Sequence, residues 1–161
     1  MKSDNPLKHF VLAFLLALIV YALFYQGIEH RRARNGPWRV TFTNDASGVA
    51  TILINQPKLS ITNVQITFPG ESVSPANPSG ALGTFIFSQP KQVPFDVPFG
   101  KCIFMDSTFL PGTLTFHLFG HEIELLPRVL LIDHKEYHWV SNSSVILRRS
   151  DLNNVLQKKS H

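Results

Sequence analysis

Four of the seven histidines lie in residues 117–138, and no other part of the sequence suggests chemistry as strongly. Two glutamates, Glu122 and Glu124, lie in the same stretch. A transition-metal site needs several imidazole or carboxylate groups that converge on one point. The candidate metal ligands are therefore His117, His121, His134 and His138.

Strand periodicity bears on whether these histidines can converge. Residues 113–119 alternate in the manner of a β-strand, with Leu114, Phe116 and Leu118 on one face. His117 has the opposite parity, so we expect Phe116 to be buried and His117 to face solvent. The four-residue spacing of His117 and His121 would suit a helix, but this segment is predicted to be extended.

Beyond Gly120 the apolar parity changes. Ile123 and Leu125 become the apolar positions, and His121 shares their parity. His117 and His121 are therefore predicted to lie on opposite faces, unless a bulge at Gly120 resets the register. His134 falls in a turn. We expect no metal site, and a metal-binding or metal-delivery domain that uses these histidines remains the alternative hypothesis.

Glu122 and Glu124 are also candidates for acid–base chemistry. Side chains two residues apart on a strand lie about 7 Å apart, a distance at which paired carboxylates of glycosidases can act. The same alternation is typical of the solvent face of a half-buried strand, and we favour that interpretation. The sequence has no Gly-x-Ser-x-Gly and no glycine-rich phosphate loop. We therefore expect neither an enzyme nor a cofactor.

The single cysteine, Cys102, lies in the apolar run 102–105. One cysteine excludes an internal disulfide. A lone cysteine in a strand is usually a small buried hydrophobic residue, and we expect Cys102 to be one.

Short alternating runs dominate the chain after residue 37, and the composition is rich in Phe, Ile, Val, Leu and Thr. The predicted strands are 38–43, 49–55, 58–68, 82–87, 102–106, 113–119, 122–126, 129–132, 136–140 and 145–148. In the third of them, Thr62, Val64, Ile66 and Phe68 are expected to share one face. Residues 69–80 are predicted to be a loop, and the proline-rich segment 89–100 an extended edge or crossover.

Nine or ten short strands separated by turns predict an all-β fold, an antiparallel β-sandwich or a jelly roll. The expected domain covers residues 38–149. Residues 150–161 have Leu152, Val155 and Leu156 at helical spacing, so they are predicted to form a tail or a short helix.

The chain begins with an apolar segment that is long enough to cross a membrane. Residues 10–25 contain no charged residue, and the apolar stretch extends to about 20 residues, which is about 30 Å of helix. We predict a tail at 1–7, a transmembrane helix at 8–28 that contacts the lipid bilayer, and a basic linker at 29–37. A cleaved signal peptide is the alternative, but the segment lacks a small-residue cleavage site at its C-terminal end, so a signal-anchor is favoured.

Two opposing arguments bear on the orientation of this helix. Lysine and arginine counts favour a cytoplasmic domain, because Arg31, Arg32, Arg34 and Arg39 lie after the apolar stretch and only Lys2 and Lys8 lie before it. A short N-terminal tail is instead typical of a signal-anchor that exports the domain on its C-terminal side. We expect the domain on the exported side of the membrane.

Net charge is +4, and the basic residues cluster near residues 31–34 and near the C-terminus. Both clusters flank the domain, whereas nucleic-acid binding needs a basic surface interleaved with stacking aromatics. Nucleic acid is therefore not an expected partner. An anchor joined to a β-domain without a polar site predicts an interaction or structural module, such as an accessory subunit of a membrane complex, with a protein partner in or at the membrane.

Overall fold

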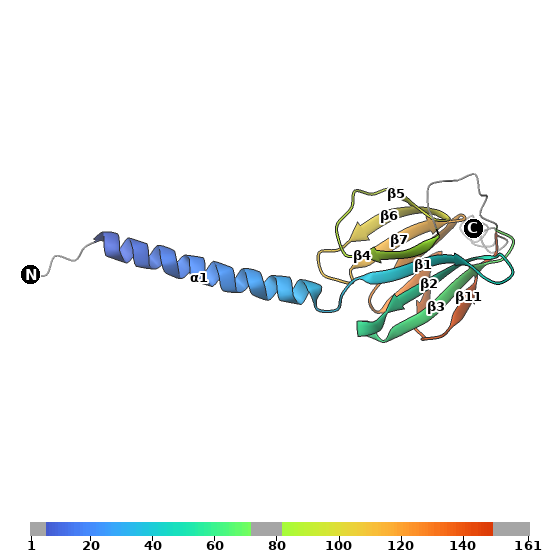
Figure 1. Cartoon of the computed structure of the whole chain (residues 1–161), viewed down its shortest axis with the longest axis horizontal. Coiled ribbons are helices and arrows are strands. Elements are labelled where there is room, and N and C mark those ends of the chain that lie inside the picture. The colour runs from blue at the N-terminus through green and yellow to red at the C-terminus, as the bar shows by residue number, and fades with distance from the viewer. Residues whose placement is uncertain (1–5, 72–81, 150–161) are drawn as a thin grey trace, which may run out of the picture. The chain divides into compact units, whose positions relative to one another are not determined.

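The structure of the protein is a computed structural model that describes residues 6–71 and 82–149. The chain divides into two compact units, Met1–Arg34 and Asn35–His161. In the described part of the first unit, a single helix, α1 (Pro6–Ala33), accounts for nearly every residue (Figure 1). The predictions for residues 1–5, 72–81 and 150–161 lie outside the described residues.

Helix α1 is longer than the predicted 8–28 at both ends. Its 28 residues correspond to about 42 Å at the α-helical rise, and none of them is buried. It is long and apolar enough to cross a membrane. A length of about 42 Å matches the hydrocarbon core of a bilayer together with its two headgroup regions.

The last turn of α1 explains the extra length at the C-terminal end. Arg32 donates to Glu29 at 3.3 Å, three residues earlier on the same helical face. Basic side chains in a last turn also interact favourably with the helix dipole. The helix ends at Ala33. Gly36, whose φ of 70° is left-handed, and Pro37 follow the end and prevent the helix from continuing.

Replacing Leu16 with arginine tests the anchor. A charge at the centre of the helix should cost about 2.5–3.5 kcal/mol of insertion free energy. We expect the Leu16→Arg protein to move into the soluble fraction after an alkaline carbonate wash of membranes. Gln26→Arg is the control, because an arginine near the helix end can extend its side chain to the interface. Full membrane retention of Leu16→Arg would show that α1 is not the sole anchor.

The second unit is a β-sandwich of two sheets (Figure 1). Sheet A has the strand order β11-β3-β2-β1-β4, and sheet B has the order β10-β9-β8-β7-β6-β5. The strands of sheet A are β1 (Trp38–Asn44), β2 (Ala50–Gln56), β3 (Ile61–Phe68), β4 (Gly83–Phe87) and β11 (Ser144–Ile146). The strands of sheet B are β5 (Phe95–Val97), β6 (Gly100–Asp106), β7 (Thr113–Leu118), β8 (His121–Leu125), β9 (Val129–Ile132) and β10 (Lys135–His138).

The predicted all-β sandwich is confirmed. All strand pairs are antiparallel except β11 with β3, which run parallel in the described residues. The proline-rich segment supplies the edge strand β5, as expected of an extended edge. Between residues 35 and 148, the described residues contain one helical element, the three-residue 3₁₀ turn η1 (Pro57–Leu59).

The predicted start of the third strand was wrong. Residues 57–59 form η1, and β3 begins at Ile61. Asn63 has a φ of 50°, and its backbone N–H donates to the side chain of Asn55 instead of to a backbone carbonyl. This irregularity shifts the parity, so Ile61 is buried and Thr62 is not, although Val64 further along has the predicted inward orientation.

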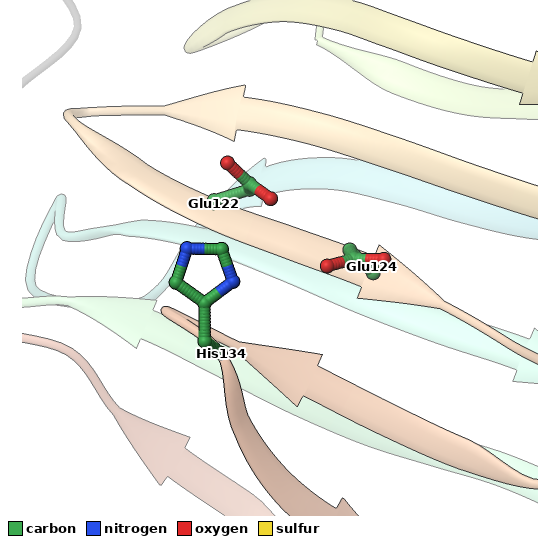
Figure 2. Close-up of side chains that lie close together, drawn as sticks. All are labelled: Glu122, Glu124 and His134. Atoms are coloured by element: carbon green, nitrogen blue, oxygen red, sulfur yellow. The ribbon is translucent and has the colours of Figure 1, made fainter.

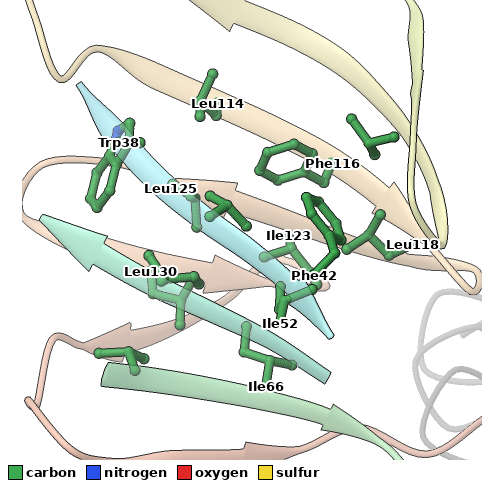
Figure 3. Packing of buried hydrophobic residues seen from close by; sticks show 14 of the residues in the cluster. Trp38, Phe42, Ile52, Ile66, Leu114, Phe116, Leu118, Ile123, Leu125 and Leu130 are labelled. Carbon is green, nitrogen blue, oxygen red and sulfur yellow. The ribbon is translucent and has the colours of Figure 1, made fainter. Parts of the chain in front are cut away.

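The facing surfaces of the two sheets form one aromatic-rich core (Figure 3). Phe42 of sheet A makes edge-on ring contacts with Phe85 of its own sheet and with Phe116 of sheet B. Phe116 in turn makes an edge-on contact with Phe87, at 5.5 Å between ring centroids. Cys102 is buried in the same core, as predicted.

Candidate functional site

The four candidate histidines do not converge. His121 is 1% exposed and points into the core at the start of β8. His117 on β7 is exposed on the opposite face, so the predicted separation of these two side chains is confirmed. His134 lies in the β9–β10 turn, and His138 is an exposed residue of β10.

A different set of side chains lies close together. Glu122, Glu124 and His134 each offer a ligand atom, and these atoms are all within 4.8 Å of one another. Figure 2 shows both glutamates projecting from the same strand, with the imidazole of His134 directed toward Glu122. We call these three residues the Glu–Glu–His cluster. The sequence singled out each member, but it did not predict their association.

The position of the two glutamates follows from strand pairing. Glu122 and Glu124 alternate with buried Ile123 on β8, so both face outward from sheet B. His117 is the cross-strand partner of Glu122 on β7. Leu131 on β9 is the cross-strand partner of Glu124 on the other side. The cluster therefore lies on the outer face of sheet B, away from the core.

The turn that holds His134 is attached to β8 through Asp133. Both turn residues have positive φ, 50° for Asp133 and 64° for His134, as in the two-residue turns that match strand twist. The Asp133 carboxylate accepts from the backbone N–H of Glu122 at 2.9 Å and from His121 Nδ1 at 2.6 Å. The Asp133 N–H donates to the Glu122 carbonyl at 2.8 Å.

Sequence reasoning missed Asp133, because an Asp-His pair in a turn has no distinctive pattern. Only the preference of aspartate for left-handed turn positions indicated this location. Its contacts join residues that are 11 and 12 positions apart in the chain. They fix the backbone of the His134 turn to the backbone of Glu122, and so restrict where the imidazole can lie relative to the two carboxylates.

The negative charge of the two glutamates in the cluster is not balanced by a neighbouring lysine or arginine among the described residues. Glu122 and Glu124 are both half-buried. Within residues 6–71 and 82–149, neither carboxylate has a lysine or arginine within ion-pair distance. Two neighbouring carboxylates repel each other, and partial burial weakens the screening of that repulsion by water. The arrangement favours a bound cation.

Cys102 is unsuited to reactive chemistry. Burial raises the pKa of its thiol to about 11, despite a hydrogen bond to the Phe104 carbonyl. Because the thiolate is the nucleophile and metal ligand, a thiol this hard to ionise is inert at neutral pH.

A groove of about 360 Å³ lies at the edge of the sandwich where β4 meets the start of sheet B. Phe85, Ile86 and Phe87 of β4 line it, together with Phe95 and Met105. Lys91 also lines it, with its Nζ 4.0 Å from the centre of the Phe95 ring. The groove is therefore mostly apolar, and Ser88, Gln89 and one cationic group also line it.

No protein-family model, no curated protein and no solved structure matches this chain.

Proposed function

We propose that the protein is a membrane-anchored interaction module, and that it binds an extended segment of a partner protein along β4. The support is the character of this edge strand. Its sequence, Gly-Thr-Phe-Ile-Phe, carries no charge, and Ile86 is 56% exposed. An unpaired strand edge is a template for a further strand, and natural proteins usually protect it with charges, proline or short length.

The other sheet edges in the described residues are better protected. β5 and β11 are only three residues long, and β10 reads Lys-Glu-Tyr-His. β4, with five residues, is the longest of the four edges. In the described residues it pairs with β1 alone. A peptide that extends sheet A would gain main-chain hydrogen bonds at β4, as in other recognition by strand addition.

The groove beside β4 would provide side-chain specificity. Phe85, Phe95 and Met105 offer apolar surface to alternate side chains of an added strand. Lys91 supplies a positive charge at the same place, so an apolar segment with an acidic residue is the best complement. The partner is therefore expected to present a β-prone, weakly acidic segment.

The anchor would restrict where such a partner lies. Four residues, 34–37, connect the end of α1 to β1. They span about 14 Å at most when fully extended. If α1 spans the bilayer as a signal-anchor, the domain stays near the exported surface, and the partner is a protein in or at that membrane. A membrane topology assay on intact cells tests this part of the proposal.

Changing Ile86 to lysine should block strand addition, because a charge at the centre of the edge is a natural device against pairing. We expect a photo-crosslinker at position 84, in the full-length protein in native membranes, to give a discrete adduct. We expect Ile86→Lys to reduce that adduct by about tenfold or more, the change that 1.4 kcal/mol of lost binding produces.

Ile146→Lys is the matched control. Ile146 is 56% exposed, as Ile86 is, and lies on β11 at the opposite edge of the same sheet. Both substitutions are at exposed positions and should change stability by no more than about 0.5 kcal/mol. Equal adduct yields in the two variants would refute docking at β4.

A further inference from the structure

We propose that the Glu–Glu–His cluster, Glu122, Glu124 and His134, binds a divalent first-row transition-metal ion of the Zn²⁺ type. This inference is independent of docking at β4, because the cluster lies on the outer face of sheet B. It also differs from the ligand set of the alternative hypothesis from the sequence, since His134 alone of the four candidate histidines belongs to it.

The geometry is close to what such an ion requires. Ligand atoms around a tetrahedral ion at about 2.1 Å lie about 3.4 Å from one another. The three donor atoms of the cluster are already within 4.8 Å of one another without an ion. The distances therefore need to shorten by about 1.4 Å at most. A glutamate side chain rotates about three bonds, so other rotamers of Glu122 and Glu124 can supply this change.

The donor chemistry selects the class of ion. One imidazole nitrogen and two carboxylate oxygens form a mixed set that suits Zn²⁺ and its first-row neighbours. Ca²⁺ takes six to eight oxygen ligands, and Mg²⁺ prefers oxygen ligands and retains several waters. A transition-metal ion is therefore expected to bind this site more tightly than Ca²⁺ or Mg²⁺ does. His134 is the ligand that gives this preference, because it supplies the nitrogen donor.

The unbalanced charge of the two glutamates is a separate argument for a cation. Neither Glu122 nor Glu124 has a lysine or arginine partner among the described residues, and both are half-buried. Elsewhere in the domain, by contrast, Asp96 pairs with Lys101 at 3.0 Å. A divalent ion would remove the repulsion between the two glutamate carboxylates and bind both.

The supporting contacts favour a preformed site. Asp133 connects the His134 turn to the Glu122 backbone through a carboxylate contact at 2.9 Å and a backbone hydrogen bond at 2.8 Å. Three protein ligands leave at least one coordination position open to water or to an exchanging ligand. A half-buried site with an open coordination position suits reversible loading.

The test is calorimetric titration of Zn²⁺ alone into the full-length protein in detergent, purified without a polyhistidine tag. We expect one Zn²⁺ per chain. Substitution of outer-shell residues typically weakens metal binding about 10–100-fold, so loss of a direct ligand in Glu124→Gln or His134→Asn should weaken it at least as much. Asparagine is chosen at position 134 because it tolerates the left-handed backbone there.

His138→Asn is the matched control, because His138 is an exposed histidine of the next strand outside the cluster. It should bind Zn²⁺ as the wild type does, and excess Mg²⁺ or Ca²⁺ should not displace the ion. Thermal melts with chelator show whether each variant is folded. If His134→Asn is unfolded, the Zn²⁺ affinity of Glu124→Gln tests the proposal. Absence of a Zn²⁺ binding heat in the wild type, or unchanged affinity in the folded cluster variants, overturns the proposal.

Discussion

Replacing Phe116 with alanine is expected to lower the free energy of unfolding by about 3–5 kcal/mol, the usual cost of removing a buried phenylalanine. The side chain is fully buried between the two sheets. Its ring makes edge-on contacts with Phe42 and Phe87 at centroid distances of 6.2 and 5.5 Å. The substitution therefore removes apolar transfer energy and leaves a cavity bordered by rigid rings, which cannot collapse easily.

The neighbouring residue provides the control for Phe116. His117 is exposed on the outer face of the same strand, so His117→Ala should change stability by no more than about 0.5 kcal/mol. Chemical denaturation of both full-length variants in detergent, with chelator present, measures the difference. Comparable losses of unfolding free energy in Phe116→Ala and His117→Ala would mean that the buried and exposed faces of the strand are assigned the wrong way round.

Much of the sandwich could be predicted because its strands obey a period of two. The parity of Leu114, Phe116 and Leu118 was sufficient to place these side chains in the core and His117 outside it. The buried position of His121 followed from the same rule after the turn at Gly120, where φ is 92°. Local alternation and turn residues are properties of short segments, and short segments can be interpreted without knowledge of the fold.

Other features depend on contacts between distant segments, and the sequence pattern did not predict them. The late start of β3 depends on Asn55, whose side chain accepts a hydrogen bond from Asn63. The parallel pairing of β11 with β3 joins Val145 to Ile66, and nothing local to either segment specifies a parallel partner. The C-terminal extension of α1 depends partly on the Glu29–Arg32 contact. Residues 29–37 were predicted to be a basic linker because of their charges, and that prediction did not include this contact.

The candidate site was only half predictable for the same reason. Alternation placed Glu122 and Glu124 together on one face of a strand. That His134 joins them depends on the pairing of β8 with β9 and on the attachment of the following turn through Asp133. Both are tertiary contacts, and the sequence therefore suggested four histidines where the fold brings one histidine to two glutamates.

Replacing Asp133 with alanine is accordingly expected to have an effect far larger than its turn position suggests, about 3–5 kcal/mol of lost stability. The substitution leaves the buried Nδ1 of His121 and the backbone N–H of Glu122 without their acceptor. Hydrogen bonds to a charged group contribute about 1.5–3 kcal/mol each, and removal of one partner of a buried pair is strongly destabilising. At a φ of 50°, aspartate is also better tolerated than alanine, so the substitution carries a further, smaller backbone cost.

Asp133→Asn separates these causes. Asparagine tolerates the left-handed conformation, and its amide oxygen can still accept from one of the two donors, so it should lose less than half of what alanine loses. Thermal melts of the two full-length variants in chelator give the comparison. Asp96→Ala is the surface control, since Asp96 is exposed and pairs with Lys101. If Asp133→Ala melts as Asp96→Ala does, Asp133 does not hold the turn to β8. The arrangement that brings His134 to Glu122 and Glu124 would then need another explanation.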